Sequence, residues 1–313
     1  MLIGTYQFSC RFTDEAELPY FKGATFRGVF GRALKNVVCA LKRNECSQCL
    51  LNKKCLYPHV FETSDISESV PGSRVSGPPH PFVIEPPLIN TTHFQEDDPF
   101  DFNLVLFGEV NQSLPYFIYA FEQMGRIGLG RRMNGHRGRF LLEEVRVEDR
   151  PIYTSQTRTL STDGTFREWT LIPPDDSGQE TFALRIHLLT PLRFKFENHL
   201  KADLPFHILV RNMLRRISTL LNHYGEGEPD LDYKGMVARA REVRVAEDHL
   251  AWFDWRRYSF RQDRSMLMGG IIGNITYEGK IGEFMPLIDF CTKTHLGKQT
   301  TFGLGLIRAE KIK

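Results

Sequence analysis

The sequence has no long run of apolar residues. It is 313 residues long and 41% hydrophobic, but no window approaches the ~18–20 apolar residues that a membrane span needs. The opening MLIGTYQFSCRF also lacks the basic segment and long apolar run of a secretion signal. We therefore expect a cytoplasmic protein with no membrane partner. This length is enough for two domains of ordinary size.

Carboxylates are present, but they do not form the paired or clustered array of a two-metal nuclease site. Magnesium would find few ligands, so we expect no catalytic metal. Disulfides are also unexpected. Of the six cysteines, Cys10 and Cys291 stand alone and the other four lie close together. This clustering suits a reducing compartment and a bound metal better than a disulfide framework.

The clustered cysteines are Cys39, Cys46, Cys49 and Cys55. The two residues between Cys46 and Cys49 give the spacing used in zinc knuckles, and four thiolates suit a tetrahedral structural site. The sequence therefore predicts one structural zinc that pins the loop after the first helix. An iron–sulfur cluster and unmetallated thiols are the alternatives, and Cys39 still follows the helical pattern of a core residue.

The formal net charge of +2 hides a strong segregation of charge. Basic residues dominate from Lys22 to Lys54, and the segment from Arg126 to Arg139 has five arginines and no acid. The segment from Glu62 to Asp101 is acidic. This pattern predicts a basic surface that meets a polyanion. The alternative is a set of solvated faces with no partner.

The chain repeats its own pattern. Residues 5–12 and 181–188 alternate apolar and polar side chains, as half-buried strands do. Each is followed by the pattern Leu-Pro-aromatic and then by the spacing of an amphipathic basic helix. Proline is tolerated in a first helical turn, so this pattern predicts the start of a helix. Each half then closes with Gly-Leu-Gly and a last strand.

This order predicts an α+β fold of two tandem ferredoxin-like (RRM-like) modules, each with a glycine-rich loop before its last strand. We place the N-terminal module, with the cysteine cluster as an insertion, at residues 1–150. A linker rich in Ser, Thr, Pro and Asp occupies residues 151–180, where residues 166–172 could add a short strand. The C-terminal module then covers residues 181–313.

Two groups of motifs resemble a known family. The C-terminal half contains YSFRQ and HLGKQTTFGLG, and the N-terminal half contains FKGATFRGVFGRAL, CLYPHVFE and PFVIEPP. The ordered set resembles the CRISPR RNA-processing nucleases of the RAMP superfamily, the Cas six family, and in particular a subgroup with extra cysteines. The resemblance implies tandem ferredoxin-like domains and cleavage of CRISPR repeat RNA to a 2′,3′-cyclic phosphate and a 5′-hydroxyl. It also implies a catalytic histidine in or just after the first helix, but residues 20–40 contain none.

Cleavage through the RNA's own 2′-hydroxyl needs a base, an acid and cations near the phosphate. Histidine suits the first two roles because its reference pKa of ~6.5 makes both forms available near neutral pH. His295 and Lys298, just before the glycine loop, are the first candidates, and His59 beyond the cysteines is the second. Tyr258 is a possible orienting group. Each histidine could instead have only a structural role, and Tyr258 could be packing.

Basic side chains and glycine-loop amides are the candidates for phosphate contacts. They are Arg27, Arg32, Lys35, Arg126, Arg131, Arg132, Arg137, Arg211, Arg215, Arg261, Gly297, Gly303 and Gly305. The leading hypothesis is an endoribonuclease acting on CRISPR repeat RNA, with an effector complex as a possible partner. A noncatalytic RAMP subunit that holds guide RNA is the main alternative, and a zinc-containing nucleic-acid-binding regulator is the third.

Overall fold

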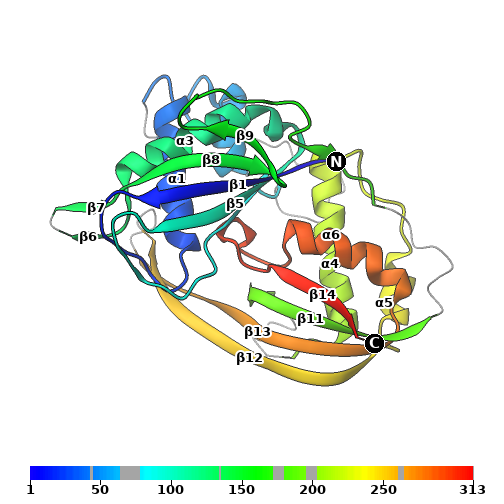
Figure 1. Cartoon of the computed structure of the whole chain (residues 1–313). Helices are drawn as coiled ribbons and strands as arrows, with labels where there is room; N and C mark the ends of the chain where they lie inside the picture. Colours follow the sequence, from blue (N-terminus) through cyan, green and yellow to red (C-terminus); the bar gives the residue numbers. More distant parts are fainter. Residues whose placement is uncertain are drawn as a thin grey trace. The chain divides into compact units, whose positions relative to one another are not determined.

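A computed structural model describes residues 1–42, 45–63, 78–133, 135–171, 180–194, 203–259 and 264–312. The chain folds as two compact units (Figure 1). Unit 1 comprises Met1–Trp169 with His223–Gly225, and unit 2 comprises Thr170–Asn222 with Glu226–Lys313. No helix in these described ranges is both long and apolar enough to cross a membrane.

Unit 1 is built on an antiparallel sheet centred on β1 (Leu2–Phe12). The sheet runs in the order β3-β5-β1-β8-β9, and a short strand β10 also pairs with β1. Alternate residues of β1, among them Tyr6, Phe8 and Phe12, are fully buried, as the period of two predicts. The other strands are β3 (Phe82–Glu85), β5 (Pro99–Phe107), β8 (Phe140–Val147), β9 (Arg150–Thr154) and β10 (Arg167–Glu168).

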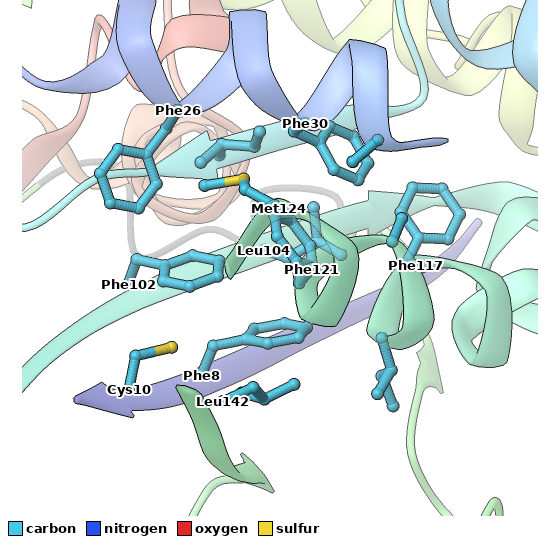
Figure 2. Close-up of a cluster of buried hydrophobic side chains, with 14 of the residues drawn as sticks. Phe8, Cys10, Phe26, Phe30, Phe102, Leu104, Phe117, Phe121, Met124 and Leu142 are labelled. Carbon is cyan, nitrogen blue, oxygen red and sulfur yellow. The ribbon is translucent and has the colours of Figure 1, made fainter. Parts of the chain in front are cut away.

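Two helices, α1 (Gly23–Val38) and α3 (Leu114–Ile127), pack on this sheet through phenylalanines (Figure 2). The Phe30 ring of α1 stacks on the Phe121 ring of α3 with centroids 4.5 Å apart. Phe121 in turn lies 4.7 Å from Phe8 of β1. Burying each such ring contributes roughly 1.5–3 kcal/mol. The aromatic contacts therefore fix the position of α1 relative to α3.

Shorter elements complete unit 1. Two small two-stranded sheets join β2 to β4 and β6 to β7, and a short helix α2 follows the cysteine-containing segment. Their bounds are β2 (Ala16–Glu17), η1 (Asn52–Lys54), α2 (Leu56–Phe61), β4 (His93–Phe94), η3 (Gly108–Ser113), β6 (Leu129–Met133) and β7 (His136–Gly138).

Unit 2 repeats the plan with a four-stranded sheet in the order β12-β13-β11-β14 among the described residues. The Phe206 ring packs on Tyr277 and Phe284, and the Tyr277 hydroxyl donates a hydrogen bond to the Leu204 carbonyl at 2.7 Å. The elements are β11 (Thr181–Leu192), α4 (Phe206–Tyr224), α5 (Tyr233–Arg239), β12 (Arg244–Ser259), β13 (Arg264–Lys280), η5 (Gly282–Phe284), α6 (Met285–Thr294), η6 (Thr300–Phe302) and β14 (Ile307–Ile312).

The predicted α+β class is confirmed. The stretch predicted as a linker, however, lies partly inside unit 1. Strand β9 extends the first sheet, where Ile152 and Tyr153 are buried, and β10 pairs with the start of β1. The short strand considered at residues 166–172 corresponds to β10. Strand β9 was missed because it is short and lies at the edge of the sheet.

Candidate nucleic-acid interface

The strands β6 and β7 form a small hairpin, called here the arginine hairpin, that gathers basic residues of unit 1. Leu129 pairs with Gly138 and Met133 with His136 across it. The side chains of Arg131, Arg132 and His136 are exposed, whereas Arg137 is half-buried. A histidine thus lies in the open on the same hairpin as three arginines.

Glycines allow the hairpin to lie directly against β2. Gly130 has φ of 79°, and a Cβ there would lie 2.1 Å from the Glu17 carbonyl oxygen. A Cβ on Gly138 would lie 2.3 Å from the Ala16 Cβ. Only glycine permits so close a backbone approach, and only glycine adopts such a positive φ at little cost. The hairpin is therefore positioned by close backbone packing against β2.

Arg137 is the most constrained of these arginines. Its Nη1 donates a hydrogen bond to the Gly130 carbonyl at 2.6 Å. Burial lowers the pKa of Arg137, and the nearby positive charges of Arg32 on α1 and Arg132 lower this pKa further. An arginine stays protonated regardless. Arg32 and Arg132 therefore both repel Arg137, and an anion placed beside Arg137 would relieve that repulsion.

Ion pairs separate the basic residues into two classes. Arg139 binds the Asp14 carboxylate through Nε at 2.7 Å and Nη2 at 3.0 Å, and Arg131 lies 3.5 Å from Glu17. Within the part of the chain that the structure describes, no ion pair to a carboxylate involves Arg32, Arg132 or Arg137. We call these three residues the arginine cluster. It is the group best suited to bind phosphate.

Other basic candidates lie elsewhere. Arg27 lies over the Phe61 ring at 5.1 Å and Lys35 over the Tyr57 ring at 5.3 Å, so both help to pack α2 against α1. Three further candidates are exposed on helices: Arg126 on α3, and Arg211 and Arg215 on α4. Arg261 lies outside the described residues, and so does the side chain of Tyr258.

The structure places His295 inside unit 2, away from solvent. Its side chain is 0% exposed, and Nδ1 lies 3.0 Å from the Leu304 carbonyl oxygen. Arg216 donates hydrogen bonds to the carbonyls of Thr294 and His295 at the end of α6. The structure therefore does not present the His295 ring to solvent, and its catalytic role stays a prediction. The position of His295 just before the glycine loop has a structural reason, because its ring contacts the Leu304 carbonyl oxygen within that loop.

The glycine loop itself is closely packed. Gly297 and Gly305 have φ of 87° and 76°, and a Cβ on either would come within 2.6 Å of a backbone oxygen. Gly303 also has a positive φ of 82°. The amide of Lys298 donates to the Arg193 carbonyl at 2.7 Å, and the Lys298 side chain is exposed. These glycines are required by the fold of the loop whether or not their amides also meet RNA.

Two histidines lie in or near α2, with different surroundings. The His59 side chain has an exposed surface, and partial desolvation lowers its pKa below 6.5. The His80 Nδ1 lies 2.9 Å from the Val60 carbonyl oxygen and therefore carries a proton. Burial, with help from Arg27, lowers the pKa of His80 to about 4. His80 is thus a neutral structural residue, and His59 is the accessible one.

The four clustered cysteines are all within the described residues. Cys46 is buried, and burial together with the charge of Glu62 raises its pKa, with smaller contributions from Cys55 and Cys39. No three His, Cys, Asp or Glu side chains in the described ranges are arranged to hold a metal. The arrangement does not by itself supply the predicted zinc ligands, and zinc stays a prediction from the spacing.

His136 was not identified as a catalytic candidate from the sequence. Its neighbourhood in the chain, with arginines on both sides, is visible in the sequence. What the sequence does not reveal is that Arg32 of α1 approaches the same hairpin. This electrostatic interaction joins segments about a hundred positions apart, and local periodicity carries no signal of it.

Family comparisons address both halves of the chain. The family described as CRISPR-associated endoribonuclease Cas6 matches residues 186–307, and the family described as AF_1859_N, N-terminal domain, matches residues 1–165. Residues 186–307 therefore belong to the Cas6 family, and residues 1–165 belong to the AF_1859_N family. An uncharacterized protein of Archaeoglobus fulgidus is 27% identical over 215 residues, which are 67% of this chain and 66% of that protein. The match thus spans just under two thirds of that relative's length.

Solved structures share the fold at low identity. A Cas6 product complex matches with a TM-score of 0.55 and 11% identity, over 98% of this chain and all of the other. A Thermus thermophilus Cas6 gives a TM-score of 0.51 at 11% identity, over 99% and 98% of the two chains. A partial Cas6-RT-Cas1–Cas2 complex gives 0.60 at 13% identity and covers 99% of this chain but 46% of the larger one. Together with the two sheets described above, these likenesses show tandem ferredoxin-like domains.

We predict that Gly130→Ala destabilises unit 1 and weakens RNA binding, because the new methyl group would meet the Glu17 carbonyl in a strained backbone. The loss of unfolding free energy should be about 1–3 kcal/mol, measured by chemical denaturation. Gly135→Ala is the matched control, since Gly135 also has a positive φ but nothing lies within 4 Å of its added Cβ. Equal effects of the two substitutions would show that contact with β2 does not position the hairpin.

Proposed function

We propose that this chain cuts CRISPR repeat RNA (pre-crRNA) without a metal, through attack of a 2′-hydroxyl on the adjacent phosphate. The products are a 2′,3′-cyclic phosphate and a 5′-hydroxyl. The match of residues 186–307 to the Cas6 endoribonuclease family supports the substrate class. The observation that carries the chemistry is the exposed His136 on a hairpin whose Arg132 and Arg137 have no carboxylate partner among the described residues.

The reaction has three requirements. A base removes the 2′-hydroxyl proton, an acid protonates the leaving 5′-oxygen, and cations stabilise the extra negative charge on the phosphate oxygens. The arginine cluster meets the third requirement. Because Arg137 is repelled by both Arg32 and Arg132, the added negative charge of the transition state is favoured there.

Proton transfer is assigned to His136, which is exposed on the arginine hairpin. His59 is the second candidate because it is accessible and its pKa is lowered by desolvation, which keeps the ring neutral and able to accept a proton near pH 7. His295 would need to leave its contact with the Leu304 carbonyl before it could touch RNA. Lys298 and Tyr258 remain proposals for contacts in unit 2.

The second candidate function is that of a noncatalytic RNA-binding subunit of a CRISPR effector complex. Such a subunit would need the same arginine cluster, but no acid–base group. The burial of His295 and the absence of a histidine from α1 favour this alternative. The structure adds no observation in favour of a zinc-containing regulator.

Cleavage of labelled repeat RNA should proceed in EDTA, because neither the base nor the phosphate contacts in this scheme use a metal. Deoxyribose at the cleavage nucleotide should abolish cutting while RNA binding persists, since only the nucleophile is removed. The measurement is single-turnover cleavage followed by analysis of the product ends. Cutting of the deoxy substrate, or a strict magnesium requirement, would contradict the mechanism. No cutting of any repeat RNA would favour the noncatalytic subunit.

We predict that His136→Ala slows single-turnover cleavage by at least ~10²-fold while RNA affinity changes little, because a proton-transfer group acts mainly in the transition state. His249→Ala is the control, since His249 is exposed on β12 in the other unit. His59→Ala and His295→Ala are measured in parallel. A wild-type rate for His136→Ala together with an inactive His59→Ala would show that His59 of α2, and not His136, is the acid–base group.

A further inference from the structure

The outer face of α3 carries two exposed tyrosines that neither the core nor the reaction explains. Tyr116 is 54% exposed and Tyr119 is 49% exposed. Phe117 and Phe121 of the same helix are fully buried and point into the core (Figure 2). The two tyrosines lie three positions apart and are therefore neighbours on the helix surface.

The exposed face continues toward the end of the helix. Tyr116, Tyr119, Gln123 and Arg126 follow one another at intervals of three or four, so they share one face, called here the α3 stripe. Two exposed aromatic rings followed by an exposed arginine suit a ligand that offers flat faces and negative charge.

The charges of α3 favour an anionic ligand. Its one acidic residue, Glu122, accepts a hydrogen bond from the Tyr153 hydroxyl and lies 3.7 Å from Arg158. That carboxylate is therefore already neutralised. At the C-terminal end of the stripe, Arg126 is exposed, and the chain passes from there through Gly128 into the arginine hairpin. In the sequence, the α3 stripe is therefore followed directly by the arginine hairpin.

We propose that the α3 stripe binds single-stranded RNA that flanks the repeat. The rings of Tyr116 and Tyr119 stack on bases, and Arg126 contacts a phosphate. Aromatic faces combined with a basic track are the usual means of binding single strands without sequence preference. That the RNA is a CRISPR transcript rests on the proposed function; the preference for a single-stranded flank rests on the stripe itself.

The test compares two RNAs that carry deoxyribose at the cleavage nucleotide, so that binding is measured without cutting. One is the bare repeat and the other has a single-stranded extension of about ten nucleotides, within the range that one such surface covers. We expect wild-type protein to bind the extended RNA at least about tenfold more tightly, by fluorescence anisotropy. The Tyr116→Ala, Tyr119→Ala double variant should lose this preference and bind the bare repeat normally.

Controls separate stacking from general damage. The Tyr116→Phe, Tyr119→Phe variant keeps both rings and should keep the preference. Leu141→Ala removes an equally exposed apolar side chain from β8 and should also keep it. Equal affinity of wild-type protein for the two RNAs, or a preference that survives loss of both rings, would overturn the proposal and make a protein partner the better occupant.

The outcomes also distinguish this inference from the proposed function. A protein that prefers the extended RNA but never cuts a ribose substrate refutes the endoribonuclease and leaves the RNA track in place. A protein that cuts the bare repeat and shows no preference for the extension supports the enzyme and refutes the track.

Discussion

The close approach of Gly130 to the backbone of β2 is the constraint on which the candidate site depends. Arginines on a flexible loop would move apart to reduce their mutual repulsion. Here the hairpin is fixed by backbone packing against Glu17, and Arg137 is tied to the Gly130 carbonyl. The folding of unit 1 stabilises this arrangement against the repulsion between the like charges. Such a preorganised positive site can stabilise a phosphate without rearranging when it binds.

The aromatic core completes this arrangement. The stacking of Phe30 on Phe121 holds α1 against α3, and α1 carries Arg32 to the hairpin that follows α3. The same packing turns Tyr116 and Tyr119 outward, because positions on the opposite side of α3 are filled by Phe117 and Phe121. One set of core contacts thus determines both the position of the arginine cluster and the exposure of the α3 stripe.

The fold could be predicted from sequence because its signals are local. Alternation in β1 and β11, and apolar spacing in α1 and α4, identify the elements and their repeat. The first proline is less informative, because Pro19 lies before α1 begins at Gly23. The candidate site was harder to predict from the sequence. The motif around His295 is prominent in the sequence, yet the side chain is buried, because a histidine beside a glycine loop can serve the loop's own folding. The meeting of Arg32 with the arginine hairpin depends on tertiary packing, which no local pattern encodes.

The most direct test of the arginine cluster is the salt dependence of RNA binding. Each phosphate contact to a single strand contributes about 0.7 to the slope of log affinity against log salt concentration. The Arg132→Ala, Arg137→Ala variant should therefore lose about 1.4 from that slope. Arg139→Ala should leave it nearly unchanged, since Arg139 is already paired with Asp14. An unchanged slope in the double variant, or an equal loss in Arg139→Ala, would contradict the account.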